Sequence, residues 1–299
     1  MTSRPAQVGI SIIPDTGSLE RSRALVRVAD EGGLAFVGVQ DHPYQHHFFD
    51  TWSLIPTLLA ETKRISFFTD VASLPLRPPA VMAKAAASLD VLSGGRFELG
   101  LGGGARPELI ANFGGPRRTP GETVEAIDEA IDVIRLLWSD ERSVSFEGKH
   151  YRLSDARPGP HPAHPISIWV GAFKPRMIRL VGRKADGWLP SLGVLTREEM
   201  RAGNQQIDEA ADKAGRDPRS VRRLLNVQGL IGDTSPARSE LPVGYLAGEP
   251  LAGPAGWWLE TIAGFVQDGF DTIVFWPVDP SPGQVELLIS EIVPQLPGS

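Results

Sequence analysis

The stretch ISFFTDVASLPLRPPAVMAKAAASLDVLSGGRFELGLGGG, residues 65 to 104, decides the fold class of this chain. Its β-branched and aromatic run Ile65–Val71 predicts a strand, and Pro78-Pro79 predicts the start of a helix. A Ser-Gly-Gly stop ends this helix before a second apolar strand, Phe97–Leu101. Two strands joined by a helix in this way form a right-handed parallel crossover. Three glycines follow the carboxyl end of the second strand, where parallel α/β folds bind their ligands.

The same alternation of strand and helix signals runs along the whole chain. Short apolar runs predict eight strands: Val8–Ile13, Phe36–Gln40, Ile65–Val71, Phe97–Leu101, Ile166–Val170, Gly187–Pro190, Arg223–Leu230 and Thr272–Trp276. Segments of helical character predict eight helices: Leu19–Glu31, Trp52–Thr62, Ala80–Leu92, Glu122–Trp138, Pro175–Lys184, Glu198–Ala214, Trp257–Asp268 and one after Gly283. Eight such units in 299 residues predict an α/β fold, a (β/α)8 TIM-type barrel forming one domain over residues 1–299.

Two stretches interrupt the alternation. Residues Val144–Leu153, with a turn at Glu147-Gly148-Lys149, predict a hairpin inserted after the fourth helix. The segment Gly232–Gly256, rich in Gly, Pro and Ala, predicts a long loop after the seventh strand. This loop is either a plain surface insertion or a lid over a site, and the sequence leaves both open.

The composition is that of an ordinary globular protein. The formal charge is −6, with 41% hydrophobic and 22% charged residues, so no nucleic-acid or anionic-membrane partner is expected. The absence of cysteine excludes disulfides and thiolate metal sites. The first residues have no charged segment followed by a cleavable apolar stretch, and no run of 18 apolar residues occurs. These features predict a cytoplasmic protein without a membrane partner.

Five short motifs occur in order along the chain: Val39–Pro43, Leu92–Phe97, Gly100–Gly104, Phe146–Tyr151, and Ile168–Ala172 with Ala185–Trp188. Together they resemble the bacterial-luciferase-like flavin and deazaflavin oxidoreductases, from about Val8 to Trp276. The resemblance implies a TIM-type barrel that binds the deazaflavin coenzyme F420, or alternatively FMN, at the carboxyl ends of its strands. It also implies a homodimer, and an FMN enzyme would need a partner flavin reductase.

The resemblance also assigns residues to the cofactor. The ring would lean on a bulge of the third strand with a non-proline cis peptide bond, aligned here with Thr69-Asp70. Glycines after strand four would let the backbone come close to the ring or the phosphate of the cofactor. Loops after strands five and six would hold the phosphate at the start of a helix. The cofactor residues are Thr69, Asp70, Ala72, Gly102, Gly103, Gly104, Gly171, Ala172, Phe173, Ser191, Leu192 and Gly193. Without the resemblance, a strand end, a tight turn and a simple helix start explain them as well.

Asp41 and His42 form the candidate catalytic pair, because they follow the second strand at the end where barrels carry their sites. Imidazole relays protons near neutral pH, and an adjacent carboxylate can orient it or raise its pKa. In the deazaflavin enzymes that the chain resembles, the equivalent histidine stands where hydride leaves the substrate. A loop histidine can equally be solvated or structural. The substrate pocket, suited to an uncharged or apolar compound, is assigned to Tyr44, His46, Phe48, Gln228 and Trp276, which plain packing explains equally well.

The chain departs from its sugar-phosphate-oxidising relatives at two places. Where those enzymes have a glutamate after the glycine loop, this chain has Ala105 followed by Arg106. Their phosphate-binding lysine after strand six is replaced by Leu192-Gly193-Val194. These differences argue against a sugar phosphate substrate. A second proton-handling group is expected near His42, with His46, His47 and Glu108 as the candidates.

Four functions remain open. The leading one is an F420-dependent oxidoreductase, and the second is an FMN-dependent monooxygenase on the same scaffold. The third is a relative that binds flavin without catalysis. The fourth is a metal-dependent hydrolase using Asp41, His42, His46 and His47. Strands five and six end in glycine and proline, where metal hydrolase barrels place further ligands, so we expect no metal site.

Overall fold

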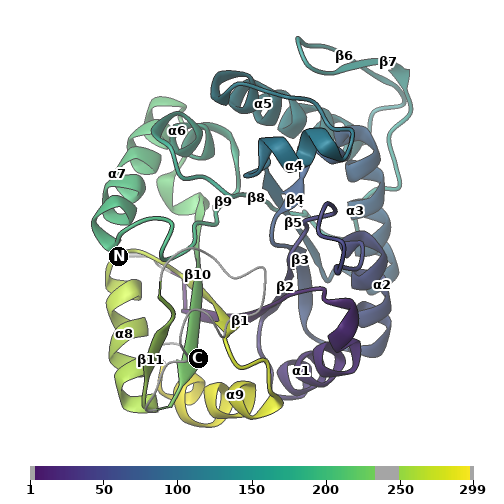
Figure 1. Cartoon of the computed structure of the whole chain (residues 1–299). Coiled ribbons are helices and arrows are strands. Elements are labelled where there is room, and N and C mark those ends of the chain that lie inside the picture. The colour runs from purple at the N-terminus through teal and green to yellow at the C-terminus, as the bar shows by residue number, and fades with distance from the viewer. Residues whose placement is uncertain (1–3, 233–248, 297–299) are drawn as a thin grey trace.

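Eight parallel strands close into a barrel at the centre of the computed structural model, which describes residues 4–232 and 249–296 (Figure 1). The barrel strands are β1 (Gln7–Ile12), β2 (Phe36–Val39), β3 (Ser66–Thr69), β5 (Phe97–Gly102), β8 (Ile168–Val170), β9 (Gly187–Trp188), β10 (Arg222–Ile231) and β12 (Thr272–Pro277). Pairing of β1 with β12 and of β10 with β9 closes the ring. The two-residue strand β4 (Ala72–Ser73) pairs with β5 just beyond β3, so β3 and β4 together form one position of the barrel. The predicted (β/α)8 fold is confirmed.

Helices surround the barrel and cover its outer face (Figure 1). They are α1 (Leu19–Glu31), α2 (Thr51–Glu61), α3 (Pro79–Ser93), α5 (Pro120–Leu137), α6 (Pro175–Lys184), α7 (Arg197–Lys213), α8 (Ala255–Gln267) and α9 (Pro282–Leu287). All eight predicted helices are therefore present. The short helix α4 (Pro107–Asn112) was not predicted. In the described part of the chain, no helix is both long and apolar enough to cross a membrane.

Local sequence signals explain where the helices begin and end. α5 and α7 both start with a capping box, in which Thr119 pairs with Glu122 and Thr196 pairs with Glu199. Each threonine side chain accepts a hydrogen bond from the backbone amide of its glutamate, and each glutamate carboxylate accepts one from the backbone amide of its threonine. α3 ends at Gly94, whose φ of 71° is the left-handed conformation that glycine adopts readily.

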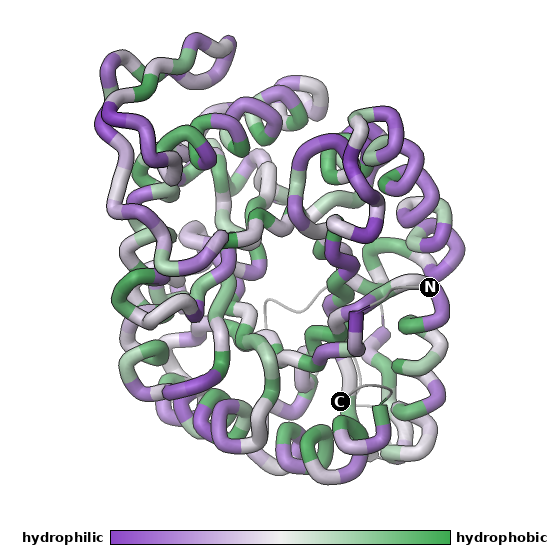
Figure 2. The backbone as a smooth tube through the Cα atoms, turned by 180° about the vertical axis from the view of Figure 1, so that it is seen from behind, coloured by the Kyte–Doolittle hydropathy of each residue, from purple (hydrophilic) through white to green (hydrophobic). Residues whose placement is uncertain are grey.

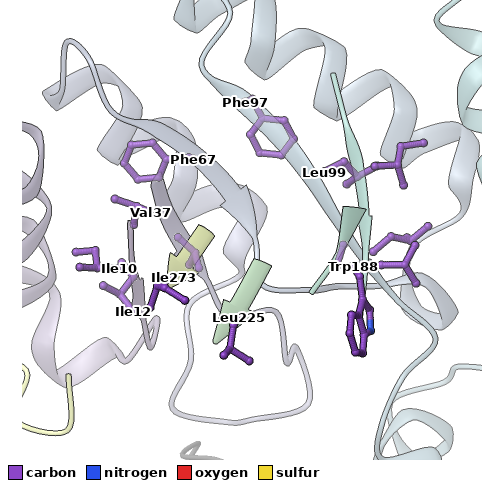
Figure 3. Packing of buried hydrophobic residues seen from close by; sticks show 14 of the residues in the cluster. Ile10, Ile12, Val37, Phe67, Phe97, Leu99, Trp188, Leu225 and Ile273 are labelled. Atoms are coloured by element: carbon purple, nitrogen blue, oxygen red, sulfur yellow. The ribbon is translucent and has the colours of Figure 1, made fainter. Parts of the chain in front are cut away.

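The alternation of side chains along the strands divides the apolar residues into two layers. Ile10, Val37, Phe67 and Ile273 face outward and pack between the strands and the helices (Figure 3). Their neighbours on the same strands face the barrel interior, since side chains alternate along a strand. The buried interior cluster is Phe36, Phe68, Trp169, Leu189, Leu224 and Val274.

Arg222 lies at the amino-terminal end of the barrel, below this interior cluster. Its guanidinium lies 5.4 Å from the ring centroid of Phe36 and 5.9 Å from that of Trp169. It also donates a hydrogen bond of 3.2 Å to Asp271. With this end filled, the open end of the barrel is the carboxyl end of the strands, where the predicted site residues lie.

The predicted hairpin is present as the antiparallel pair β6 (Val144–Glu147) and β7 (Arg152–Ala156), with its turn at residues 148–151. Figure 2 shows it projecting from the ring of helices as a mostly purple and pale tube. Most of the predicted long loop, residues 233–248, falls outside the described residues. Within the remainder, β11 (Leu251–Gly253) pairs in parallel with β10 and was not predicted.

Candidate active site

A cis peptide bond marks the bulge that follows β3. The bond joins Asp70 to Val71, so the expectation of a cis bond at Thr69-Asp70 is wrong by one residue. Thr69 is instead part of the regular sheet, and its hydroxyl donates a hydrogen bond of 2.7 Å to the carbonyl of Gly100. The bulge is present where the resemblance implied it, and it presents the side chain of Val71 to the interior cluster.

The glycines after β5 make room for the protein's own side chains. A Cβ on Gly102 would lie 2.5 Å from Cγ2 of Val71, and one on Gly103 would lie 2.3 Å from Cγ2 of Thr123. A Cβ on Gly104, whose φ is +88°, would lie 2.4 Å from Cδ1 of Ile110. Internal packing therefore disfavours a side chain at all three positions, whether or not a ligand also approaches the backbone there.

The side chain of Asp70 points into the barrel, where its carboxyl group accepts hydrogen bonds from two other strands. Ser11 of β1 donates a 2.7 Å hydrogen bond to Oδ2 of Asp70, and Asn226 of β10 donates one of 2.8 Å to Oδ1. Gly38 of β2 leaves the space, since a Cβ there would lie 3.1 Å from Asp70 Oδ2. Burial raises the pKa of Asp70, and the two hydrogen bonds offset this only in part.

Asp41 and His42 are adjacent in sequence but turn to different partners. Oδ2 of Asp41 accepts a 2.9 Å hydrogen bond from the amide of Ser73. Nδ1 of His42 lies 2.8 Å from the phenol oxygen of Tyr44. Burial, with the positive charge of Arg106, lowers the pKa of His42 to about 4. The expectation that Asp41 orients His42 or raises its pKa is therefore wrong.

Several buried polar atoms at the carboxyl end have no hydrogen-bond partner within the described residues. They are Oγ of Ser73, Oδ1 of Asn226 and Nε2 of Gln228. Buried donors and acceptors are nearly always satisfied, so such a group of orphans indicates that water or a ligand completes the site. A flat heterocycle with its own ring N–H and carbonyl groups fits this donor and acceptor set. No group of three His, Asp or Glu in residues 4–232 and 249–296 could hold a metal ion.

The loops assigned to the cofactor phosphate follow β8 and β9. The carbonyl of Ala172 accepts a 2.9 Å hydrogen bond from Nε1 of the buried Trp188, which fixes the loop before α6. In the described part of the chain, no hydrogen bond uses the amides of Ala172 and Phe173. The amide of Leu192 donates to the carbonyl of Asn226, while Gly193, at φ +89°, completes the turn after Ser191. The amide of Leu192 is therefore not free for a phosphate.

A cavity of about 430 Å³ opens beside the barrel mouth, between the ends of β1 and β12 and the start of α1. Two of the five predicted pocket residues, His46 and Trp276, line it, together with Ser11, Ile12 and Leu25. Gln228 is paired in register with Trp276 on the neighbouring strand but does not line this cavity. Tyr44 instead contacts His42, and Phe48 packs edge-on against His47.

Three residues at this end of the barrel were not predicted as site residues from the sequence: Ser11, Val71 and Asn226. Ser11 and Asn226 are small polar residues within otherwise apolar runs, at positions whose neighbours face outward. A polar residue at an interior position of a predicted barrel strand is the signal that could have found them. Val71 gives no such signal, because valine is expected in any buried strand.

The chain resembles known proteins in sequence. A sequence profile of the luciferase-like monooxygenases matches residues 4–257. An F420-dependent hydroxymycolic acid dehydrogenase of Mycobacterium tuberculosis is 32% identical over 247 residues, which are 79% of this chain and 66% of the relative. An F420-dependent glucose-6-phosphate dehydrogenase of Kineococcus radiotolerans is 33% identical over 218 residues, 71% of this chain and 64% of the relative. The chain thus spans just under two thirds of the length of these relatives.

The fold has solved counterparts. The structure of an F420-dependent secondary alcohol dehydrogenase in complex with an F420-acetone adduct superposes with a TM-score of 0.82. The match covers 96% of this chain and 98% of that one at 17% identity, so it supports the shared barrel only. The family profile extends over most of the sequence and over the bulge, the glycines and the loops described above. The chain therefore belongs to the luciferase-like monooxygenase family.

Proposed function

We propose that this protein is an oxidoreductase that transfers hydride between the deazaflavin coenzyme F420 and a small organic substrate. The observation that carries the proposal is the set of unpartnered buried polar atoms around the bulge of Asp70 and Val71. These atoms have no partner in the described part of the protein and can therefore hydrogen-bond the polar groups of a flat ring system. The relatives at about a third identity are F420-dependent dehydrogenases, which supports F420 over FMN.

The proposed roles follow from the geometry. Val71 forms the wall for the ring, and Ser73 and Gln228 supply polar atoms that face it. The amides of Ala172 and Phe173 and the amino-terminal end of α6 would hold the phosphate, aided by Ser191 and Gly193. The bound coenzyme would supply the hydride acceptor or donor. His42 is neutral at neutral pH, so its role is to hydrogen-bond the reacting oxygen of the substrate.

The substrate is proposed to be a mainly apolar compound rather than a sugar phosphate. The apolar lining residues of the cavity are Ile12, Ile13, Leu25, Trp276, Pro277 and Pro280, and they lie beside polar and charged residues that include Asp15 and Arg21. The glutamate and the lysine of the sugar-phosphate-oxidising relatives are absent, with Ala105 and Leu192 in their places. Pockets of a few hundred Å³ with apolar walls and a few polar groups are typical of small-molecule sites.

A homodimer is also proposed. Val81, Val91 and Leu92 of α3 are large apolar side chains exposed to solvent, and Leu92 has 84% of its surface accessible. A second copy of the chain that packs on α3 would cover them. A cytoplasmic location remains a prediction of the sequence.

Titration of the purified protein with F420 and, separately, with FMN tests the proposal. Changes in coenzyme absorbance and fluorescence give the two dissociation constants. We expect F420 to bind at least ~10-fold more tightly than FMN. Tighter FMN binding, with substrate oxygenation when a flavin reductase is added, would support the monooxygenase instead. Binding of neither would contradict both functions.

A further inference from the structure

Ser11 connects the buried carboxyl of Asp70 to the cavity beside the barrel mouth. Its hydroxyl lies 2.7 Å from Oδ2 of Asp70, and the same residue lines the cavity with His46 and Trp276. Ser11 has 1% of its surface accessible to solvent and Asp70 has 8%. Ser11 is therefore the residue that lines the cavity and also contacts Asp70.

Asp70 has no charged partner that would fix it in the ionised form. Its side-chain hydrogen bonds come from two neutral groups, Ser11 and Asn226, and no charged side chain in the described part of the chain contributes to its pKa. A structural buried carboxylate is normally paired with a cation or held by several amides. The pair of Asp70 and Ser11 lacks both, which is the arrangement of a group that exchanges a proton.

We propose that Ser11 and Asp70 form a proton relay between the barrel interior and a substrate hydroxyl or carbonyl in the cavity. The proposal rests on the proposed F420-dependent function, and it supplies the proton-handling group that Ala105 leaves missing. In the oxidation of an alcohol, the C–H bond breaks and its hydride goes to the oxidised deazaflavin. The O–H bond breaks as well, and its proton passes to Ser11 Oγ while the proton of Ser11 passes to Asp70 Oδ2. Reduction of the ketone reverses each transfer.

His42 is the weaker candidate for this proton transfer. With a pKa of about 4, only about one His42 in a thousand is protonated at neutral pH, so it neither stores nor supplies a proton there. Burial raises the pKa of Asp70, and a higher pKa makes its carboxylate a stronger proton acceptor. The two groups therefore divide the work, with His42 as a neutral hydrogen-bonding group and Asp70 as the proton acceptor.

The first test needs no coenzyme. Infrared spectra of the apoprotein with isotope-labelled aspartate give the carboxyl band of Asp70, identified by its loss in Asp70→Asn. We expect the band to titrate above the ordinary range of aspartate, and to shift when cyclohexanol or menthol is added as a cavity probe. In Ser11→Ala the pKa rises further, since a stabilising donor is lost, and the alcohol no longer shifts the band. Ser22→Ala removes a second buried cavity hydroxyl that makes no contact with Asp70, and the probe should still shift the band.

If neither alcohol shifts the Asp70 band in the wild type, the proposed relay is wrong. An equal response in Ser11→Ala would overturn it as well. This outcome is independent of the proposed function, because the apoprotein is measured. A wild-type protein that binds no F420 contradicts the proposed function. The infrared result still decides whether an alcohol in the cavity affects Asp70 through Ser11.

The second test uses the F420-loaded protein with the same two alcohols. The rate of coenzyme reduction should rise with pH as Asp70 ionises. Ser11→Ala and Asp70→Asn should lower it by ~10²-fold and remove that rise, with coenzyme affinity within a few fold. Ser220→Ala, just before β10 at the amino-terminal end of the barrel, is the control that should keep the wild-type profile. Wild-type pH profiles in both relay variants would contradict the proposal.

Discussion

The phenol oxygen of Tyr44 lies 2.8 Å from Nδ1 of His42. Burial raises the pKa of Tyr44 to about 12, so the phenol stays protonated. Burial and the charge of Arg106 lower the pKa of His42 to about 4. Two neutral groups thus share one hydrogen bond, and Nε2 of His42 remains available to a substrate.

Replacement of His42 by Ala should lower turnover far more than it weakens coenzyme binding. The ring and phosphate contacts proposed above come from other loops, so the dissociation constant for F420 should stay within a few fold. The rate should fall by ~10²-fold, the usual effect of losing a positioned hydrogen-bonding or acid-base group. Steady-state kinetics with menthol and a fluorescence titration measure the two quantities. Near-normal turnover in His42→Ala would reduce this residue to a packing role.

Tyr44→Phe provides a graded comparison with His42→Ala. It removes the hydroxyl that holds Nδ1 and leaves the aromatic ring, which lies 5.4 Å from the imidazole between centroids. The imidazole then loses its fixed tautomer but stays in place, so the rate should fall by only ~10-fold. A Tyr44→Phe rate as low as that of His42→Ala would mean that the phenol itself acts on the substrate.

The stability of the fold should depend on the charge of His164. Its ring lies 2.7 Å from Asp90 and 3.3 Å from Glu98, and the bond to Glu98, with the charges of both acids, raises its pKa to about 9. The folded state binds more protons than the unfolded one between pH 6.5 and pH 9. This contribution is therefore complete below pH 6.5 and is lost as the pH rises through 9.

Replacement of His164 by Gln should consequently cost about 2 kcal/mol of unfolding free energy in mild acid, after allowance for solvent screening, and much less in strong base. Urea denaturation of both proteins across this pH range measures the difference. His161→Gln is the matched control, because that side chain lies on the same connection with 54% exposure. A His164→Gln penalty that is the same at every pH would show that shape, and not charge, is what matters.

The barrel could be predicted because its signals are local. Every barrel strand coincides with an apolar run, and helices such as α1 and α6 match their predicted bounds in full. The missed elements depend on tertiary contacts instead. Six-residue α4 is too short for a helical period to be visible, and three-residue β11 exists through its pairing with β10.

The site could be predicted only as a set of neighbouring loops. Adjacency suggested that Asp41 would act on His42, but consecutive residues of an extended chain point to opposite sides. Nothing in the residues distinguishes the bond before Asp70 from the bond after it. The contact of Asp70 with Ser11 joins residues 59 positions apart, and the curvature of the sheet from β1 through β2 to β3 brings them together.

The exposed apolar residues of α3 should control oligomeric state. Leu92→Glu places a charge where 84% of a leucine is exposed, and burial of that charge at an interface is costly. Sedimentation velocity should show a dimer for the wild type and a shift to monomer for Leu92→Glu. Phe113→Glu is the matched control, since Phe113 has 58% exposure and lies outside α3. A dimer that persists in Leu92→Glu would place the interface elsewhere.

Val71 and Gly102 should behave as one structural unit. A Cβ on Gly102 lies 2.5 Å from Cγ2 of Val71, too close for any real contact, while its next neighbours lie at 3.5 and 3.6 Å. Gly102→Ala should therefore force Val71 and its bulge to move, at a cost of about 1–3 kcal/mol in unfolding free energy. It should also weaken coenzyme binding, since Val71 is the proposed wall for the ring.

The double variant separates these causes. Val71→Ala removes Cγ2, so the added methyl at residue 102 then meets only ordinary contact distances. The two substitutions together should destabilise the protein by at least ~1 kcal/mol less than the sum of their separate effects. Urea denaturation of the four proteins measures this coupling, and coenzyme titration of the same set shows whether the wall has moved. Strictly additive effects would mean that the strain of Gly102→Ala lies elsewhere and that Val71 does not set the shape of the site.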